Sequence, residues 1–131
     1  MQWDFHSDAP IYAQVMERIQ RMIVSGTLRP GERLPSVRAF ALEAGINPNT
    51  MQKALTELER SGLIYNQRTA GHFVTDDSQI IAEVRKSLAE QQTRQYLQGM
   101  RELGFKPDQT EQHLLQQLNK EGREDHANFD L

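Results

Sequence analysis

Apolar side chains at the start of the chain recur three or four positions apart, the period of one face of a helix. The first such block begins after Pro10 and stops at Gly26. Its members are Ile11, Tyr12, Val15, Met16, Ile19, Met22 and Ile23. The next stretch, 27–35, contains two prolines and one glycine. These residue types favour turns, so we expect a loop there, with Leu28 and Leu34 facing the core.

Two shorter blocks follow, and each is bounded by residues that begin and end helices. Ser36 suits the N-cap of the first, which ends at Gly45. Asn47 followed by Pro48 suits the start of the second, because proline at the first helical position needs no backbone donor. Gly62 ends this block. Two helices joined by a few residues, the second opening with small polar side chains, predict a helix-turn-helix.

Alternating apolar and polar residues then predict a β-hairpin, with strands at 63–66 and 72–75 around a turn at 67–71. From Asp77 the helical period returns and lasts until Gly104. The helical period between Asp77 and Gly104 predicts one long helix of about 25 residues.

A last helix is expected after this break, because Asp108 with Glu111 three residues later resembles a capping box. Its apolar positions are Leu114, Leu115 and Leu118. We expect the helix to end at Gly122 and residues 123–131 to fray. A helix at the end of the chain has few neighbours, so its leucines predict an interaction face.

Composition divides the chain near position 75. The 131 residues have a formal net charge of -3 and a pI near 5.8, which at face value argues against a nucleic-acid partner. However, residues 1–75 hold eight Lys or Arg against seven Asp or Glu, whereas 76–131 hold seven against eleven. Four of the five prolines also precede the boundary. We therefore expect a compact domain over 1–75 and a helical dimerisation domain over 76–131.

The residue content also argues against several classes of function. The chain has no cysteine, and its four histidines are scattered, so we expect no disulfide, no thiolate metal site and no catalytic cysteine. There is no Ser-His-Asp grouping, phosphate loop or metal-ligand spacing. We therefore expect that the protein is not an enzyme and binds no cofactor or metal. With no run of about 18 apolar residues and no basic leader, we expect a cytoplasmic protein without membrane association.

The start of the second short helix has candidate binding chemistry. In a helix-turn-helix this turn enters the major groove of DNA, which favours short hydrogen-bonding side chains. Asn47, Asn49, Thr50, Gln52 and Lys53 meet that requirement. Asn and Gln can form two hydrogen bonds with an adenine edge, and Thr50 and Lys53 suit phosphates. The alternative is an ordinary helix start followed by a solvated face.

Six short motifs stand in order between residues 9 and 75. They are Pro10-Ile11-Tyr12, Gly26-Thr27-Leu28-Arg29-Pro30-Gly31, Leu34-Pro35-Ser36-Val37-Arg38, Asn47-Pro48-Asn49-Thr50, Leu58-Glu59-Arg60-Ser61-Gly62 and Gly71-His72-Phe73-Val74. With these motifs the chain resembles the GntR family of bacterial transcription regulators. The short two-helix remainder is similar to the YtrA-type subfamily, whose tail is smaller than the ligand-binding domains of other branches.

The resemblance implies DNA contacts at an arginine, at a helix start and at a wing tip. These positions are Arg38, then Asn47, Asn49, Thr50 and Gln52, and then 68–71 with Arg68, Thr69 and Gly71. Ser36, at a helix N-terminus, would touch phosphate. Relatives usually have Gly-x-Gly in the wing, where this chain has Thr69-Ala70-Gly71. Since the first glycine allows close approach to the minor groove, this departure leaves open whether the wing enters it.

We therefore expect a mainly α protein with a small β-hairpin, built as a winged helix-turn-helix domain and a C-terminal two-helix dimerisation arm. Its expected function is that of a dimeric transcription regulator, a repressor, which binds an inverted-repeat operator in double-stranded DNA.

Two alternatives remain. The first is a protein-interaction adaptor that keeps the winged fold without binding DNA; a basic strip of Arg38, Lys53 and Arg68 would favour DNA instead. The second concerns Arg38 alone, which could form a surface ion pair with Glu43 or Glu32. The sequence leaves open the operator, the regulated genes and any small-molecule effector.

Overall fold

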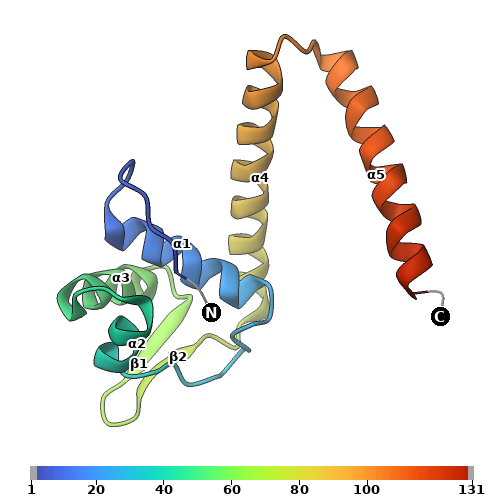
Figure 1. The fold of residues 1–131 in the computed structure, drawn as a ribbon. Helices are drawn as coiled ribbons and strands as arrows, with labels where there is room; N and C mark the ends of the chain where they lie inside the picture. Colours follow the sequence, from blue (N-terminus) through green and yellow to red (C-terminus); the bar gives the residue numbers. More distant parts are fainter. Residues whose placement is uncertain (1–2, 130–131) are drawn as a thin grey trace. The chain divides into compact units, whose positions relative to one another are not determined.

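The computed structural model describes residues 3–129, which form five helices and one antiparallel hairpin (Figure 1). The elements are α1 (Ile11–Val24), α2 (Val37–Ala44), α3 (Pro48–Arg60), β1 (Ile64–Gln67), β2 (Gly71–Val74), α4 (Ser78–Glu102) and α5 (Pro107–Phe129). They fall into two compact units, one ending at Ser87 and the other beginning at Leu88, so α4 contributes to both. The predicted fold class, mainly α with a small hairpin, is confirmed.

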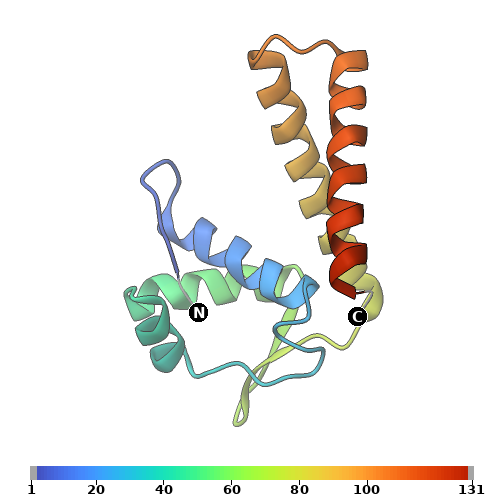
Figure 2. The ribbon, with the colours of Figure 1, turned by 45° about the vertical axis from the view of Figure 1, so that its right-hand side comes forward.

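One hydrophobic core fills the first unit, and α1, α2 and α3 supply most of it. α1 and α2 both pack against α3, and Figure 2 shows α1 crossing over α3. The largest side chains that are less than 2% exposed are Phe40, Ile19, Met51, Leu55, Leu58, Leu63, Ile64, Val15 and Val74. Each helix turns one apolar stripe inward, which is why the apolar positions recur at helical spacing. Full burial of one such side chain stabilises the fold by about 1.5 to 3 kcal/mol.

Local hydrogen bonds fix the junction between α2 and α3. The hydroxyl oxygen of Ser36 accepts from the amide of Ala39 at 3.2 Å and caps α2. Gly45 follows α2 with a left-handed φ of 74°, and its amide and the next one donate to carbonyls in the last turn of α2. The Oδ1 of Asn47 accepts from the amide of Asn49 at 2.8 Å and caps α3. The predicted helix-turn-helix and its boundary residues are therefore confirmed.

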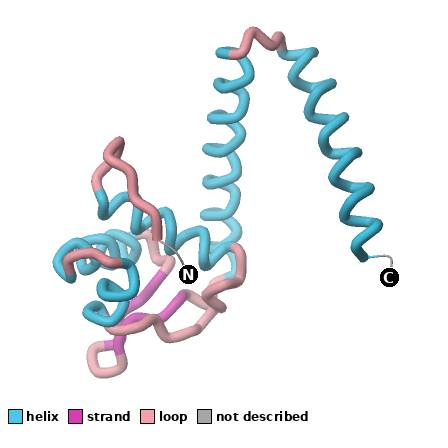
Figure 3. Tube along the Cα trace, in the orientation of Figure 1, coloured by secondary structure: helices cyan, strands magenta, loops and turns pink. Residues whose placement is uncertain are grey.

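β1 and β2 pair across a turn of three residues, 68–70 (Figure 3). This turn is shorter than the predicted turn at 67–71. The amide of Ala70 donates to the carbonyl of Gln67 at 2.9 Å, and Gly71 already pairs with Gln67. Each strand is therefore displaced by one residue from its predicted position.

The stretch before α2 is a loop, as predicted, but part of it pairs with β2. The amide of Leu34 donates to the carbonyl of His72 at 2.8 Å, and Arg33 forms a bridge with Phe73. Leu28 and Leu34 are buried, as the sequence predicts. The loop therefore fastens the start of α2 to the hairpin.

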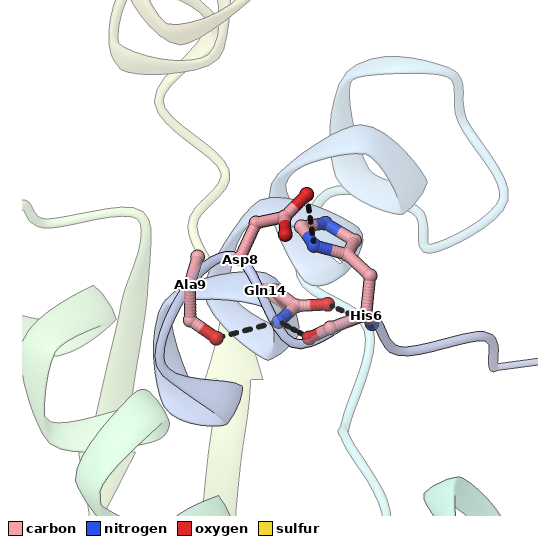
Figure 4. A network of polar contacts seen from close by, with 4 residues as sticks. All are labelled: His6, Asp8, Ala9 and Gln14. Atoms are coloured by element: carbon pink, nitrogen blue, oxygen red, sulfur yellow. Dashed lines mark hydrogen bonds and ion pairs between the residues drawn. The ribbon is translucent and has the colours of Figure 1, made fainter.

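The segment before α1 folds back onto the same core. Trp3 packs edge-on against Phe40, with 5.7 Å between the ring centroids. The side-chain oxygen of Gln14 accepts from the amide of His6 at 3.0 Å, and its side-chain nitrogen donates to the carbonyls of His6 and Ala9 at 2.7 and 2.8 Å (Figure 4). The one tryptophan of the chain thus reports on the folded core.

The first turns of α4 belong to the first unit. Ile81 is 6% exposed within the core, and Ile80 and Val84 pack against it. Asp77 caps the helix, because its Oδ1 accepts from the amide of Gln79 at 2.9 Å. The core therefore extends beyond the predicted domain boundary at position 75.

The second unit contains the rest of α4, a turn at Gly104 with a φ of 88°, and α5. At the start of α5, the side-chain oxygen of Gln109 accepts from the amide of Lys106 at 2.9 Å. The helix begins one residue before Asp108, so the predicted capping box of Asp108 and Glu111 is wrong.

α5 continues beyond the predicted end at Gly122 and reaches Phe129. Gly122 lies inside the helix and is not among the glycines with positive φ. A glycine lowers helix stability by about 1 kcal/mol relative to alanine, which is too little to stop a helix whose neighbours favour it. The predicted frayed end at 123–131 is therefore wrong up to 129, and 130–131 lie outside the described residues.

Candidate nucleic-acid interface

The first turn of α3 presents polar side chains to solvent. Asn49 and Gln52 are exposed and Thr50 is half-buried, whereas Met51 is fully buried. The two asparagines differ in what they can bind. Asn47 already uses its Oδ1 to cap the helix and keeps its NH₂ group as a donor. Asn49 can offer both a donor and an acceptor, as an adenine edge requires.

α2 contributes Ser36 and Arg38 to the same surface. The hydroxyl of Ser36 accepts a hydrogen bond as the cap, and its hydrogen can still donate to a phosphate at the helix N-terminus. Arg38 is exposed and makes no ion pair with the part of the chain that the structure describes. The alternative pairing with Glu43 or Glu32 is therefore not found, and Glu32 instead accepts from the amide of Arg29 at 2.9 Å.

An open hollow on the surface is lined by residues from both α2 and the start of α3. It is lined by Arg38, Leu42, Ile46, Asn47, Pro48 and Asn49. Arg38 comes from the exposed face of α2, whereas Asn47 and Asn49 come from the cap and first turn of α3. A guanidinium and two amides therefore border one hollow, which is the set of groups that hydrogen-bonds base edges in the major groove.

The second turn of α3 makes one contact with α1 and one within its own helix. The ammonium of Lys53 lies 3.9 Å from the centroid of the Tyr12 ring in α1, a contact that contributes about 0.5 to 1 kcal/mol at an exposed site. Gln52 donates to the hydroxyl of Thr56 at 3.3 Å. Both side chains remain exposed, so these contacts position them without covering them.

The wing tip holds Arg68 and Thr69 in solvent. No non-glycine residue in the described chain has a positive φ, so the turn folds without a glycine at position 69. Gly71 does need its conformational freedom, because its φ is 100°. A Cβ at Gly71 would meet the Nε of Arg33 at 3.5 Å, which places the Arg33 guanidinium beside the wing.

Arg33 is a surface residue that the sequence analysis did not assign to this interface. It is exposed, and it reaches the wing because its backbone bridges Phe73. That pairing joins segments far apart in the sequence, so no local pattern predicts it. The available signal was only a positive charge directly before the Leu34-Pro35-Ser36 segment.

A partly buried hydrogen bond ties the wing to α3. The Nε2 of His72 in β2 and the Oε1 of Glu59 in α3 are 2.8 Å apart, and the His72 side chain is 10% exposed. The imidazole N–H donates and the carboxylate accepts. The sequence placed His72 in the hairpin but gave no indication of its partner.

Two other features are not found in the described residues. They contain no group of three or more His, Cys, Asp or Glu side chains arranged to hold a metal ion. None of their helices is long and apolar enough to cross a membrane. The surface of α2, α3 and the wing includes exposed amides, hydroxyls and cationic groups, which suit nucleic acids.

A helix-turn-helix on a three-helix core, with a hairpin beside it, defines a winged helix-turn-helix domain. Comparison with known proteins gives the family. Residues 11–74 match the family described as "Bacterial regulatory proteins, gntR family". The chain is 36% identical over 101 residues to the HTH-type transcriptional regulator YhcF of Bacillus subtilis, covering 77% of this chain and 84% of that one. It is 34% identical over 98 residues to the HTH-type transcriptional repressor YtrA of the same species, covering 74% and 75%. The chain belongs to the GntR family, in its YtrA-like branch.

Solved structures agree with this assignment. A GntR family transcriptional regulator from Listeria monocytogenes is similar with a TM-score of 0.76 and 33% identity, covering 88% of this chain and 98% of that one. The DNA-binding domain of AraR in complex with the operator ORX1 has a TM-score of 0.52 and 28% identity, covering 57% and 99%. The protein is therefore a helix-turn-helix transcription regulator of the GntR family and not an enzyme.

Proposed function

We propose that this protein is a dimeric, sequence-specific repressor that binds an inverted-repeat operator in double-stranded DNA. The observation that carries the proposal is the hollow bordered by Arg38, Asn47 and Asn49. Arginine suits the O6 and N7 atoms of guanine, and asparagine suits the N6 and N7 atoms of adenine. Since Arg38 has no acidic partner among residues 3–122, its charge is available to DNA.

The remaining side chains would position the domain on the DNA backbone. We assign phosphate contacts to Ser36, Thr50, Lys53, Arg68, Thr69 and the backbone of Gly71, and add Arg33; Gln52 remains a candidate for an adenine edge. Ser36 adds the N-terminus of α2, where backbone amides attract an anion. Because Thr69 replaces the glycine usual in relatives, the wing would contact phosphates more than bases.

Dimerisation is proposed through the arm. Large apolar side chains of the arm remain 39 to 72% exposed in the single chain: Leu97 in α4, Leu103 in the turn after α4, and Leu114, Leu115 and Leu118 in α5. A symmetric contact with a second copy would cover such surfaces. Two α3 helices related by a two-fold axis would then meet an inverted repeat, with half-sites about 10 base pairs apart or a multiple of this distance.

The direction of regulation rests on the relatives, because YtrA is described as a repressor. A repressor covers a promoter when it binds. Because the proposed partner is operator DNA, we also propose that this protein acts in the cytoplasm.

The test is a gel shift with the DNA upstream of the protein's own gene, since such repressors commonly regulate themselves. Full-length protein is titrated against this fragment at one salt concentration, with an excess of unrelated duplex as competitor. We expect a retained complex, and footprinting should then reveal two half-sites. A protein that binds both duplexes equally weakly would support the adaptor alternative instead.

A further inference from the structure

Leu42 in α2 is the most exposed large apolar side chain of the described residues, at 83%. It lies four residues after Arg38, so the two side chains share one face of the helix. A single exposed leucine is common on protein surfaces. Whether Leu42 has a role therefore depends on its neighbours.

The neighbours of Leu42 are the residues assigned to base contacts. It lines the same hollow as Arg38, Asn47 and Asn49, and the rest of the lining is apolar. Hydrogen-bonding groups beside an apolar floor match one kind of edge in the major groove. An A·T pair presents the N7 and N6 atoms of adenine to an amide and the C5 methyl group of thymine to an apolar side chain. A phosphate offers no apolar group.

We propose that Leu42 contacts the C5 methyl group of a thymine in each operator half-site, next to the bases bound by Arg38 and Asn49. This inference rests on the proposed function. Cytosine lacks the methyl group and presents a polar amino group to the groove. Leu42 therefore selects thymine over cytosine at one position, while the charged and amide groups select its neighbours.

The test uses deoxyuridine, which differs from thymidine only by the missing methyl group. Duplexes that full-length protein retains are first selected from a random pool. Each thymine of one half-site is then replaced in turn, and the dissociation constant is measured at fixed salt for the wild type and for Leu42→Ala. We expect one position at which deoxyuridine weakens wild-type binding about threefold to fivefold. The same replacement should leave the variant unchanged.

The variant should fold, because the side chain is exposed and alanine has the highest helix propensity. Ile11→Ala is the matched control, since Ile11 is 38% exposed in α1 and does not line the hollow. It should keep the wild-type response to deoxyuridine.

Equal responses of wild type and Leu42→Ala at every thymine would overturn the inference and leave a protein partner as the role of Leu42. Failure of the pool to yield any preferred duplex would overturn the proposed function itself, and this inference with it.

Discussion

Asn47 and Asn49 show that identical residues two positions apart can have different roles. The Oδ1 of Asn47 bonds the amide of Asn49, so its acceptor is used to begin α3. Asn49 points its side chain into solvent and keeps both halves of its amide for a base. We therefore expect a substitution of Asn47 to lower stability and a substitution of Asn49 to lower DNA affinity.

Asn47→Ala should lower the free energy of unfolding by about 1 kcal/mol, because α3 loses its cap. Asn49→Ala should leave that free energy nearly unchanged and weaken operator binding by about 1 to 3 kcal/mol. Urea unfolding followed by the fluorescence of Trp3, together with gel shifts, measures both quantities. A stability loss at Asn49 with normal DNA binding would contradict the division of roles.

Arg38→Ala should cost about 1 to 3 kcal/mol of specific binding and keep the fold, because a lone exposed guanidinium contributes little to stability. Arg60→Ala is the matched control. Arg60 is exposed at the C-terminal end of α3, where it pairs with Glu57 at 3.4 Å. Both variants are compared with wild type by gel shift at the same salt. Wild-type affinity in Arg38→Ala would remove Arg38 from the interface.

Residues that act through local bonds were predictable from the sequence, and residues that act through distant neighbours were not. Ser36, Gly45 and Asn47 were predicted because a cap depends on three or four consecutive residues. The positions of Arg33 beside Gly71 and of His72 beside Glu59 depend on tertiary packing. No periodicity in a single sequence encodes such a pair.

At the scale of elements, the same distinction explains which boundaries were missed. α1, α2, α3 and α4 were predicted from apolar residues at helical spacing, because burial of one face sets that period. The hairpin was displaced by one residue per strand, because the turn closes through the amide of Ala70. The end of α5 was missed, because Gly122 was given more weight as a stop than its modest cost justifies.

The bond between His72 and Glu59 connects β2 to α3, the two elements that we propose approach DNA together. Glu59→Ala would leave the buried imidazole without its acceptor, so we expect a loss of about 1 to 3 kcal/mol in the free energy of unfolding. Glu59→Gln should keep most of it, since a side-chain carbonyl can still accept from the imidazole. Urea unfolding of both variants decides between them. Equal losses would show that the charge, and not the hydrogen bond, stabilises the pair.

At the scale of the whole molecule, the winged helix-turn-helix domain needs more chain than its motifs suggest. The family match ends at 74, yet Ile81 lies in the core and the first compact unit ends at Ser87. A fragment meant to represent the isolated domain should therefore end at 87. A shorter one would expose the apolar surface that Ile80, Ile81 and Val84 cover.

The proposed dimer is tested with the full chain, with the fragment 1–87 and with the double variant Leu115→Glu, Leu118→Glu. These two leucines are 53 and 54% exposed on α5, so the change should leave each chain folded while placing charges in the apolar contact between copies. Light scattering should give a dimer for the full chain and monomers for the other two. Both monomeric forms should bind the operator far more weakly, because one α3 contacts a single half-site. If fragment 1–87 dimerised as well as the full chain, the interface would lie in the winged domain and the leucines of the arm would serve another partner.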